Sequence, residues 1–325
     1  MDVTVVIPTK NGGELLERVL NMVFNQKTKY KYEVICVDSG SSDQTVDIIK
    51  KYPCKLFEIE SQEFGHGKTR NYGAAKGTGE FIMFLTQDAI PANEYWMESF
   101  VTAMKQDDDI AGAFGKHIPY PDCNILDKRD LKAHFENFGL QDTIFQMDNL
   151  KRYRNEEGYR HFLAFYSDNN SCMRRKFWEQ YPYDDVDFAE DQIWARKIIE
   201  KGYKKMYCAS AVVYHSHNYP LNTYFHRYYD EYKSLYKLHN YKMYTKISEM
   251  FRGVWKQIRN DYSYIENECD AEEVKKWKKY AKRRDFYRGV AGYLAGGYYF
   301  YPQSIQKFLD RHISQQYKQI KGRNH

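Results

Sequence analysis

Through about residue 115 the chain alternates short β-rich apolar runs with segments whose apolar residues recur at helical spacing. The pattern predicts strands at 3–7, 33–37, 54–59 and 81–85, with helices at 12–26, 43–51 and 68–76. Such alternation is typical of βαβ units, in which helices cover both faces of a mostly parallel sheet. The predicted fold class is therefore α/β.

The remainder of the chain divides into three parts. Periodicity fades and charge rises between about 120 and 162, as expected for an inserted helical or loop region over a sheet edge. Helical order returns at 189–201 and closes at Gly202, and after Tyr224 the pattern predicts helix throughout. We expect an α/β domain over 1–220 and a helical C-terminal extension over 221–325.

Composition narrows the class of protein. The 325 residues include six scattered cysteines with no Cys-x-x-Cys, which argues against a zinc knuckle or a secreted disulfide framework. We find no secretory leader pattern and no apolar stretch near the roughly 20 residues that cross a bilayer, so we expect a cytoplasmic protein. The net charge is +5, and the Tyr-, Lys- and Arg-rich part after Tyr214 suggests an anionic surface or ligand.

Polar residues follow the predicted strands at their carboxyl ends. Asp88 comes directly after the buried run 81–85, Thr9 follows the first strand, and Asp38 ends the second. Ligands of open α/β sheets bind at this edge, so Asp88 could hold a cation that bridges phosphates, and Asp38 and Thr9 could contact a nucleoside. Taken singly, Asp88 and Asp38 are also explained as turn or capping residues. Their convergence on one crevice favours a binding site.

The segment from Gly65 to Gly73 reads Gly-His-Gly-Lys-Thr-Arg-Asn-Tyr-Gly and leads into a helix. A glycine-flanked helix start with Lys68 and Arg70 can hold an anion, although it lacks the spacing of a Walker loop. Arg70 and Asn71 are predicted to face a diphosphate, with Arg70 ahead of Lys68 because a guanidinium can bind two phosphate oxygens.

Two further groups carry candidate chemistry. Glu190 and Asp191 begin the helix at 189–201, where they complement the helix dipole or supply a general base. His215 and His217 alternate on a β-rich run and so share one side of it. The two histidines could bind a metal, or each ring could form a hydrogen bond with a backbone group.

Read together, these segments resemble the family-2 glycosyltransferases of the GT-A fold over roughly residues 1–220. The matching blocks are Val5-Val-Ile-Pro-Thr-Lys-Asn11, Val37-Asp-Ser-Gly-Ser-Ser-Asp43, Gly67-Lys-Thr-Arg-Asn71, Leu85-Thr-Gln-Asp-Ala-Ile-Pro91 and Ala189-Glu-Asp-Gln192. The resemblance implies that Asp38 contacts the nucleoside, that Asp88 carries a divalent metal (Mn or Mg) on the diphosphate, and that Asp191 is the catalytic base, with Glu190 the next candidate. The donor site would comprise Thr9, Asp38, Lys68, Arg70, Asn71, Gln87 and Asp88.

One block departs from the family pattern. The usual Asp-x-Asp is Thr86-Gln87-Asp88 here, so a histidine such as His215 or His217 could complete the metal coordination. The combination of Phe64-Gly-His-Gly-Lys-Thr-Arg-Asn with Leu-Thr-Gln-Asp-Ala is most similar to bacterial rhamnosyltransferases. That resemblance implies a dTDP-L-rhamnose donor and a growing cell-surface polysaccharide or lipid-linked acceptor, with a UDP- or GDP-hexose donor as the alternative. Asp168, Asn169 and Asn170 are expected to contact the acceptor.

The extension allows two interpretations of its apolar, aromatic segment at 289–301, namely a packed core helix or a peripheral contact with the inner face of a bacterial plasma membrane.

Two rival functions are less consistent with the residues. A sugar-nucleotide pyrophosphorylase should have an arginine in the loop at 9–13, which this chain lacks. A nucleic-acid-binding protein would explain the basic second half but not the carboxylates Asp38, Asp88, Glu190 and Asp191, so no nucleic-acid partner is expected.

Overall fold

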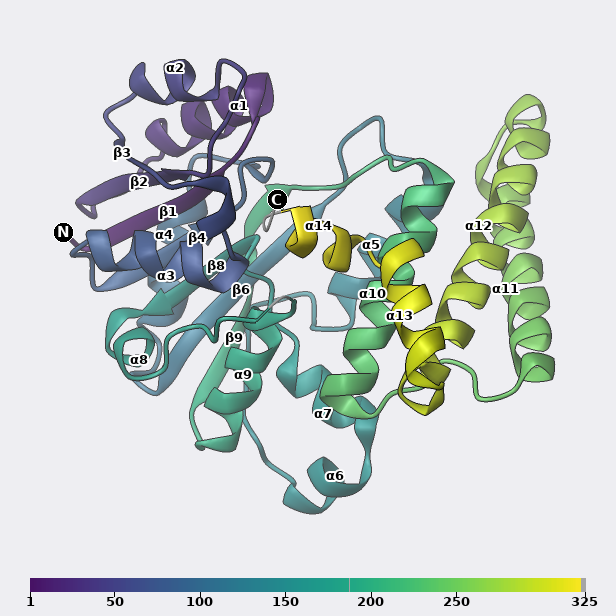
Figure 1. Cartoon of the computed structure of the whole chain (residues 1–325). Helices are drawn as coiled ribbons and strands as arrows, with labels where there is room; N and C mark the ends of the chain where they lie inside the picture. Colours follow the sequence, from purple (N-terminus) through teal and green to yellow (C-terminus); the bar gives the residue numbers. More distant parts are fainter. Residues whose placement is uncertain (187, 323–325) are drawn as a thin grey trace. The chain divides into compact units, whose positions relative to one another are not determined.

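The computed structural model describes residues 1–186 and 188–322, and the chain forms two compact units (Figure 1). The first unit comprises Met1–Cys123 and Asp127–Ser216, and the second comprises Asn124–Leu126 and His217–His325.

A single sheet organises the first unit. Its strands run in the order β3-β2-β1-β4-β8-β6-β9-β5, and β7 pairs with β9 outside this path. Pairing is parallel among β3, β2, β1 and β4 and between β6 and β9, whereas β8, β5 and β7 pair antiparallel to their neighbours. The bounds are β1 Val3–Thr9, β2 Tyr32–Asp38, β3 Lys55–Glu58, β4 Phe81–Leu85, β5 Ile90–Pro91, β6 Ile110–Ile118, β7 Thr143–Phe145, β8 Asn170–Arg174 and β9 Lys204–Tyr214.

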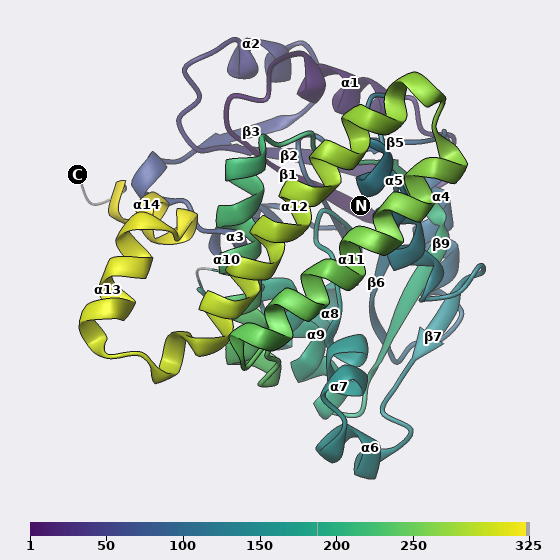
Figure 2. The ribbon, with the colours of Figure 1, turned by 90° about the vertical axis from the view of Figure 1, so that its right-hand side faces the viewer.

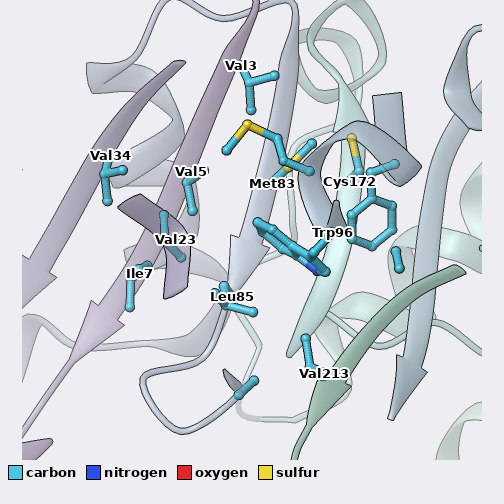
Figure 3. Close-up of a cluster of buried hydrophobic side chains, with 14 of the residues drawn as sticks. Val3, Val5, Ile7, Val23, Val34, Met83, Leu85, Trp96, Cys172 and Val213 are labelled. Atoms are coloured by element: carbon cyan, nitrogen blue, oxygen red, sulfur yellow. The ribbon is translucent and has the colours of Figure 1, made fainter. Parts of the chain in front are cut away.

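Helices cover both faces of this sheet. One face packs against α1 (Gly13–Phe24), α2 (Thr45–Lys50) and α4 (Trp96–Met104), and Figure 3 shows part of this core, including Val5, Met83 and Trp96. The other face packs against α3 (His66–Lys76), α8 (Arg175–Gln180) and α9 (Glu190–Glu200). The insertion contains α5 (Ile125–Glu136), α6 (Leu150–Asn155) and α7 (Glu157–Ala164). The predicted α/β class is confirmed.

The four predicted strands and the three helices predicted after the first three of them are present, with ends shifted by a few residues. Strand β8 was not predicted, because its sequence Asn-Ser-Cys-Met-Arg is largely polar although every residue is buried. The polar side chains of β8 have hydrogen-bond partners inside the protein. Asn170 accepts a hydrogen bond from the Trp96 indole N–H and donates one to the Ala211 carbonyl, and Arg174 donates one to the Met104 carbonyl. Hydrophobic patterning does not reveal a strand stabilised in this way.

The second unit is helical, as the pattern after Tyr224 predicted. It contains α10 (Leu221–His239), α11 (Ile247–Glu268), α12 (Ala271–Gly297), α13 (Gln303–His312) and α14 (Gln315–Gly322). Figure 2 shows α11 and α12 as a long antiparallel pair. Among the described residues, none of the helices combines the length and the hydropathy that a membrane span requires.

The first part of the apolar segment at 289–301 packs in the interior of the second unit. Gly289 faces Val254 so closely that an added Cβ would lie 2.2 Å from it, and Gly292 approaches Met243 in the same way. Ala291, Ala295 and Tyr298 are buried. The interpretation as a packed helix is therefore confirmed for residues 289–298.

Candidate active site

The turn after β2 is organised by Asp38, which is 1% exposed. One carboxylate oxygen accepts hydrogen bonds from the backbone N–H groups of Gly40 and Ser41, at 3.0 and 2.8 Å. The other accepts from Thr9 Oγ1 at 3.0 Å and from Ser41 Oγ at 2.6 Å. A carboxylate offers about four acceptor positions, and protein donors fill all four here. Asp38 and Thr9 thus join the carboxyl ends of β1 and β2.

Gln87 joins the end of β4 to the loop after β1. Its Oε1 accepts from the Lys10 N–H at 2.9 Å, and its Nε2 donates to the Lys10 carbonyl at 3.0 Å. The Lys10 ammonium then donates to the Ser39 carbonyl and to Ser61 Oγ, at 3.1 and 2.6 Å. Gln87, the middle residue of the Thr86-Gln87-Asp88 block, therefore connects two loops at this edge of the sheet.

Asp88 and the two histidines form a candidate metal site. His215 Nε2 lies 3.6 Å from Asp88 Oδ1, and one ligand atom from each of Asp88, His215 and His217 lies within 4.8 Å of the other two. With metal–ligand bonds of about 2.1 Å, ligand atoms in one coordination sphere lie roughly 3.0 to 4.2 Å apart. A donor set of one carboxylate and two imidazoles therefore fits a divalent transition metal after small side-chain movements.

Two residues that the sequence did not single out support this site. Tyr120 donates its hydroxyl to the Asp88 carbonyl at 2.9 Å and so fixes the turn that carries the carboxylate. The ring of His117, which is buried, meets the ring of His215 edge-on at 5.2 Å. Both lie on or just after β6, where no apolar alternation marked a strand. A candidate metal ligand would be held by such neighbours.

A buried cluster of charges lies where α3 meets α9. The Arg70 guanidinium is 3% exposed and contacts Asp168 at 3.0 Å and Glu190 at 3.2 Å. Asp191 accepts a hydrogen bond from the Asp168 N–H at 3.3 Å. Gly67 allows the close approach, because a Cβ there would lie 2.7 Å from the Asp184 carbonyl oxygen. Two carboxylates thus contact one guanidinium, and the carboxyl group of Asp191 adds its charge to the same cluster.

The charge balance of this cluster shifts its pKa values. Burial, reinforced by the negative charge of Asp168, raises the pKa of Asp191 to about 8. Burial and Asp168 likewise raise the pKa of Glu190. Burial alone would lower the pKa of Arg70, but the charges of Asp168 and Glu190 outweigh it and raise the pKa. Of the two adjacent acids, Glu190 is buried while Asp191 keeps partial solvent access. Asp191 therefore combines partial solvent access with a raised pKa, as expected of a candidate catalytic group.

The remaining predicted residues lie in different environments. Lys68 is exposed on α3, whereas Asn71 binds inward, accepting from Trp178 Nε1 and from the Tyr183 N–H. Asn170 is fully buried in β8, and its observed partners are protein groups. Asn169 precedes this strand and its carbonyl accepts from the Thr86 N–H.

The sheet and the polar groups at its edge together define a class of enzyme. A mostly parallel α/β sheet, polar turns at the carboxyl ends of β1, β2 and β4, and an acid pair at the start of α9 are what a GT-A nucleotide-sugar transferase requires. The model of the family "Glycosyl transferase family 2" matches residues 4–181, which is more than half of the chain. The chain belongs to this family and is a glycosyltransferase, so the predicted recognition is confirmed.

Curated relatives agree with this assignment. The O-antigen chain rhamnosyltransferase RfbN of Salmonella typhimurium is 36% identical over 235 residues, which cover 71% of this chain and 71% of RfbN. The O-antigen chain rhamnosyltransferase WbaN of Salmonella anatum is 32% identical over 231 residues, covering 70% of each chain. The predicted similarity to bacterial rhamnosyltransferases is confirmed by these two matches.

Solved structures share the fold at low sequence identity. TarS residues 1–349 of S. aureus superimpose with a TM-score of 0.54 at 16% identity, covering 90% of this chain and 91% of TarS. The mannosyltransferase PcManGT from Pyrobaculum calidifontis, solved with GDP-Man and Mn²⁺, gives a TM-score of 0.53 at 16% identity, covering 99% of this chain and 84% of the other. Both support the GT-A fold.

Proposed function

We propose that this protein transfers L-rhamnose from dTDP-L-rhamnose to a growing cell-surface polysaccharide by an inverting single displacement. The observation that carries the chemical step is Asp191, a carboxyl with partial solvent access whose pKa is raised to about 8. A general base works best when its pKa lies near the operating pH. Glu190 is less suited, because it is 6% exposed and is paired with Arg70.

In the proposed step, Asp191 accepts the proton of an acceptor hydroxyl while the hydroxyl oxygen forms a bond to C1 of the sugar. The bond between C1 and the diphosphate oxygen breaks, and dTDP leaves with the bonding electron pair. One attack on the face opposite the leaving group inverts the configuration at C1. The backbone N–H of Asp168 holds the Asp191 carboxylate through its Oδ2, which leaves Asp191 oriented for the proton.

Asp88, His215 and His217 would hold a divalent ion on the donor diphosphate. When bound, such an ion supplies positive charge to the leaving group. The imidazole ligands favour Mn²⁺ over Mg²⁺, because nitrogen donors bind the softer ion better. Lys68, exposed on α3, is the cation that we assign to the phosphates.

We assign Arg70 a positioning role instead of the phosphate contact that the sequence suggested. Both ends of its guanidinium are engaged, by Asp168 and by Glu190, and the group is 3% exposed. Asp38 and Gln87 would also have a positioning role, because each fixes turns at the donor site through hydrogen bonds to backbone groups. Asn169 stays a candidate acceptor contact, whereas Asp168 is buried in its ion pair with Arg70 and Asn170 is committed to the core.

The donor assignment draws on the names of the relatives RfbN and WbaN, both O-antigen chain rhamnosyltransferases. Closely related sites can select different sugars through a few contacts, often worth about 1–3 kcal/mol. The alternative is a UDP- or GDP-hexose donor. We further propose that the acceptor is lipid-linked, with the protein associating peripherally with the membrane that carries it.

A competition assay tests this function. Equal concentrations of dTDP-L-rhamnose, UDP-glucose, UDP-galactose and GDP-mannose are offered with Mn²⁺ and a rhamnose-containing oligosaccharide acceptor, and the released nucleotides are separated. We expect dTDP to dominate and to depend on the acceptor. Preferential release of UDP or GDP would overturn the rhamnose assignment, and acceptor-independent release would mean hydrolysis.

A further inference from the structure

The pair of helices α11 and α12 presents an apolar face that the core of the second unit does not use. Ile247, Phe251 and Trp255 follow one another at intervals of four on α11 and are 56%, 54% and 61% exposed. Residues four apart lie on the same side of a helix. The core side of α11 is formed by other residues, including the buried Met250 and Val254. A row of large exposed side chains in a folded domain indicates a contact surface.

Basic residues surround this face. The stretches 250–260 and 274–284 together contain ten Lys or Arg and no Asp or Glu. Nine of the ten are at least partly exposed, and Arg284 is buried beside Asp261 and Asp285. Arg259 lies over the ring of Trp255, with its guanidinium carbon 4.7 Å from the ring centroid. The nearby acids Asp261 and Asp285 are buried, so they do not offset this charge at the surface.

The two helices also form an apolar hollow at the same face. Ile258 of α11 and Lys282, Arg283, Phe286 and Tyr287 of α12 line a cavity of about 240 Å³. Phe286 is 44% exposed. Apolar contact area therefore lies next to exposed cations.

The chemistry of this face selects one partner. A second copy of the chain would bring the same positive charge and be repelled. A nucleic acid would contact the cations and stack on the aromatic rings, but it gains little from the aliphatic Ile247 and Ile258. Helices that lie in the surface of a membrane combine Trp and Phe on one side with Lys and Arg beside them. Anionic head groups and acyl chains satisfy both features together.

We propose that the face formed by Ile247, Phe251, Trp255, Ile258 and Phe286, with its basic border, docks on an anionic phospholipid bilayer. The aromatic rings enter the head-group region while Arg252, Lys256, Arg259, Lys282 and Arg283 contact lipid phosphates. This surface is distinct from the segment at 289–298, which packs inside the unit. The inference concerns lipid binding and does not depend on the donor or acceptor proposed above.

Sedimentation with vesicles tests the proposal on the full chain. We expect binding to vesicles of phosphatidylcholine plus phosphatidylglycerol and little binding to phosphatidylcholine alone. Replacing both Phe251 and Trp255 by Ser should weaken binding at least about tenfold, because large apolar groups leave the interface. The pair Lys282→Gln and Arg283→Gln should weaken it roughly thirtyfold, at about 1 kcal/mol for each charge.

A matched control separates this face from general surface apolarity. Leu140 lies in the first unit and is 83% exposed, so Leu140→Ser should leave vesicle binding unchanged. Circular dichroism would establish that each variant is folded, and a blue shift of Trp fluorescence on vesicles should disappear in Trp255→Ser. Equal vesicle binding by all variants would overturn the proposal, as would tight binding of an RNA oligomer that vesicles do not displace. A dimer that Trp255→Ser dissociates would also overturn it.

Discussion

Replacing Asp191 by Asn should abolish transfer and stabilise the fold. The amide keeps the shape of the side chain but cannot accept a proton, and loss of a general base typically lowers kcat by about 10²- to 10⁴-fold. Nucleotide binding should stay nearly unchanged, because Asp191 is not among the proposed donor contacts.

The stability gain follows from the direction of the pKa shift. Burial and the charge of Asp168 raise the pKa of Asp191 from its ordinary 3.8 to about 8, so the folded state binds the proton more tightly than the unfolded state. Stability is therefore lost as pH rises through this range. A tenfold change in proton affinity is worth about 1.4 kcal/mol. The ionised Asp191 therefore lowers the free energy of unfolding above pH 8 by at most roughly 6 kcal/mol. Partial solvent access reduces this, and we expect Asp191→Asn to gain about 1–3 kcal/mol.

The same pKa sets the pH dependence of the wild type. In the free enzyme, kcat/KM should rise with pH up to about 8 and then level, since the base must be ionised to accept a proton. The assays are initial rates with dTDP-L-rhamnose over roughly pH 5.5–9.5, a range that brackets the raised pKa of Asp191, and urea unfolding of both proteins at high pH. An Asp191→Asn variant that keeps near wild-type turnover would refute the assignment and make Glu190 the next candidate. A rate independent of pH between about 6 and 9 would contradict the raised pKa.

Three further perturbations test the surrounding site. Asp88→Ala should weaken dTDP binding when Mn²⁺ is present and not in EDTA, as measured by calorimetry; full wild-type activity in excess EDTA would contradict a metal role. Arg70→Met leaves Asp168 and Glu190 without their buried cation, so the free energy of unfolding should fall by about 3–5 kcal/mol, and a loss under about 1 kcal/mol would show that the cluster adjusts by protonation. Gln87→Ala removes two hydrogen bonds to the Lys10 backbone and should raise KM for the donor while kcat changes little, whereas an unchanged KM would rule out a positioning role.

The sequence by itself determined the order of elements in the first half of the chain. Runs such as 81–85 are apolar throughout because the strands are buried on both faces, and turn residues mark their carboxyl ends. The family blocks then identified Asp88 and the acid pair 190–191 as candidates. These signals are local, since each depends on neighbours within a few positions of the chain.

Only the tertiary structure decided what the candidates contact. Arg70 and Glu190 are 120 positions apart, and their pairing depends on α3 and α9 packing on the same face of the sheet. Asp38 could be a ligand or a turn residue in sequence, and the structure fills its acceptor positions with protein donors. Strand β8 gave no periodic signal, because polar partners distant in sequence stabilise it in place of a patterned apolar face. Tyr120 and His117 matter only through their contacts with Asp88 and His215, which lie far from them in sequence. The charge of a side chain is fixed by its type, but its burial and its pKa depend on which distant groups the fold brings beside it.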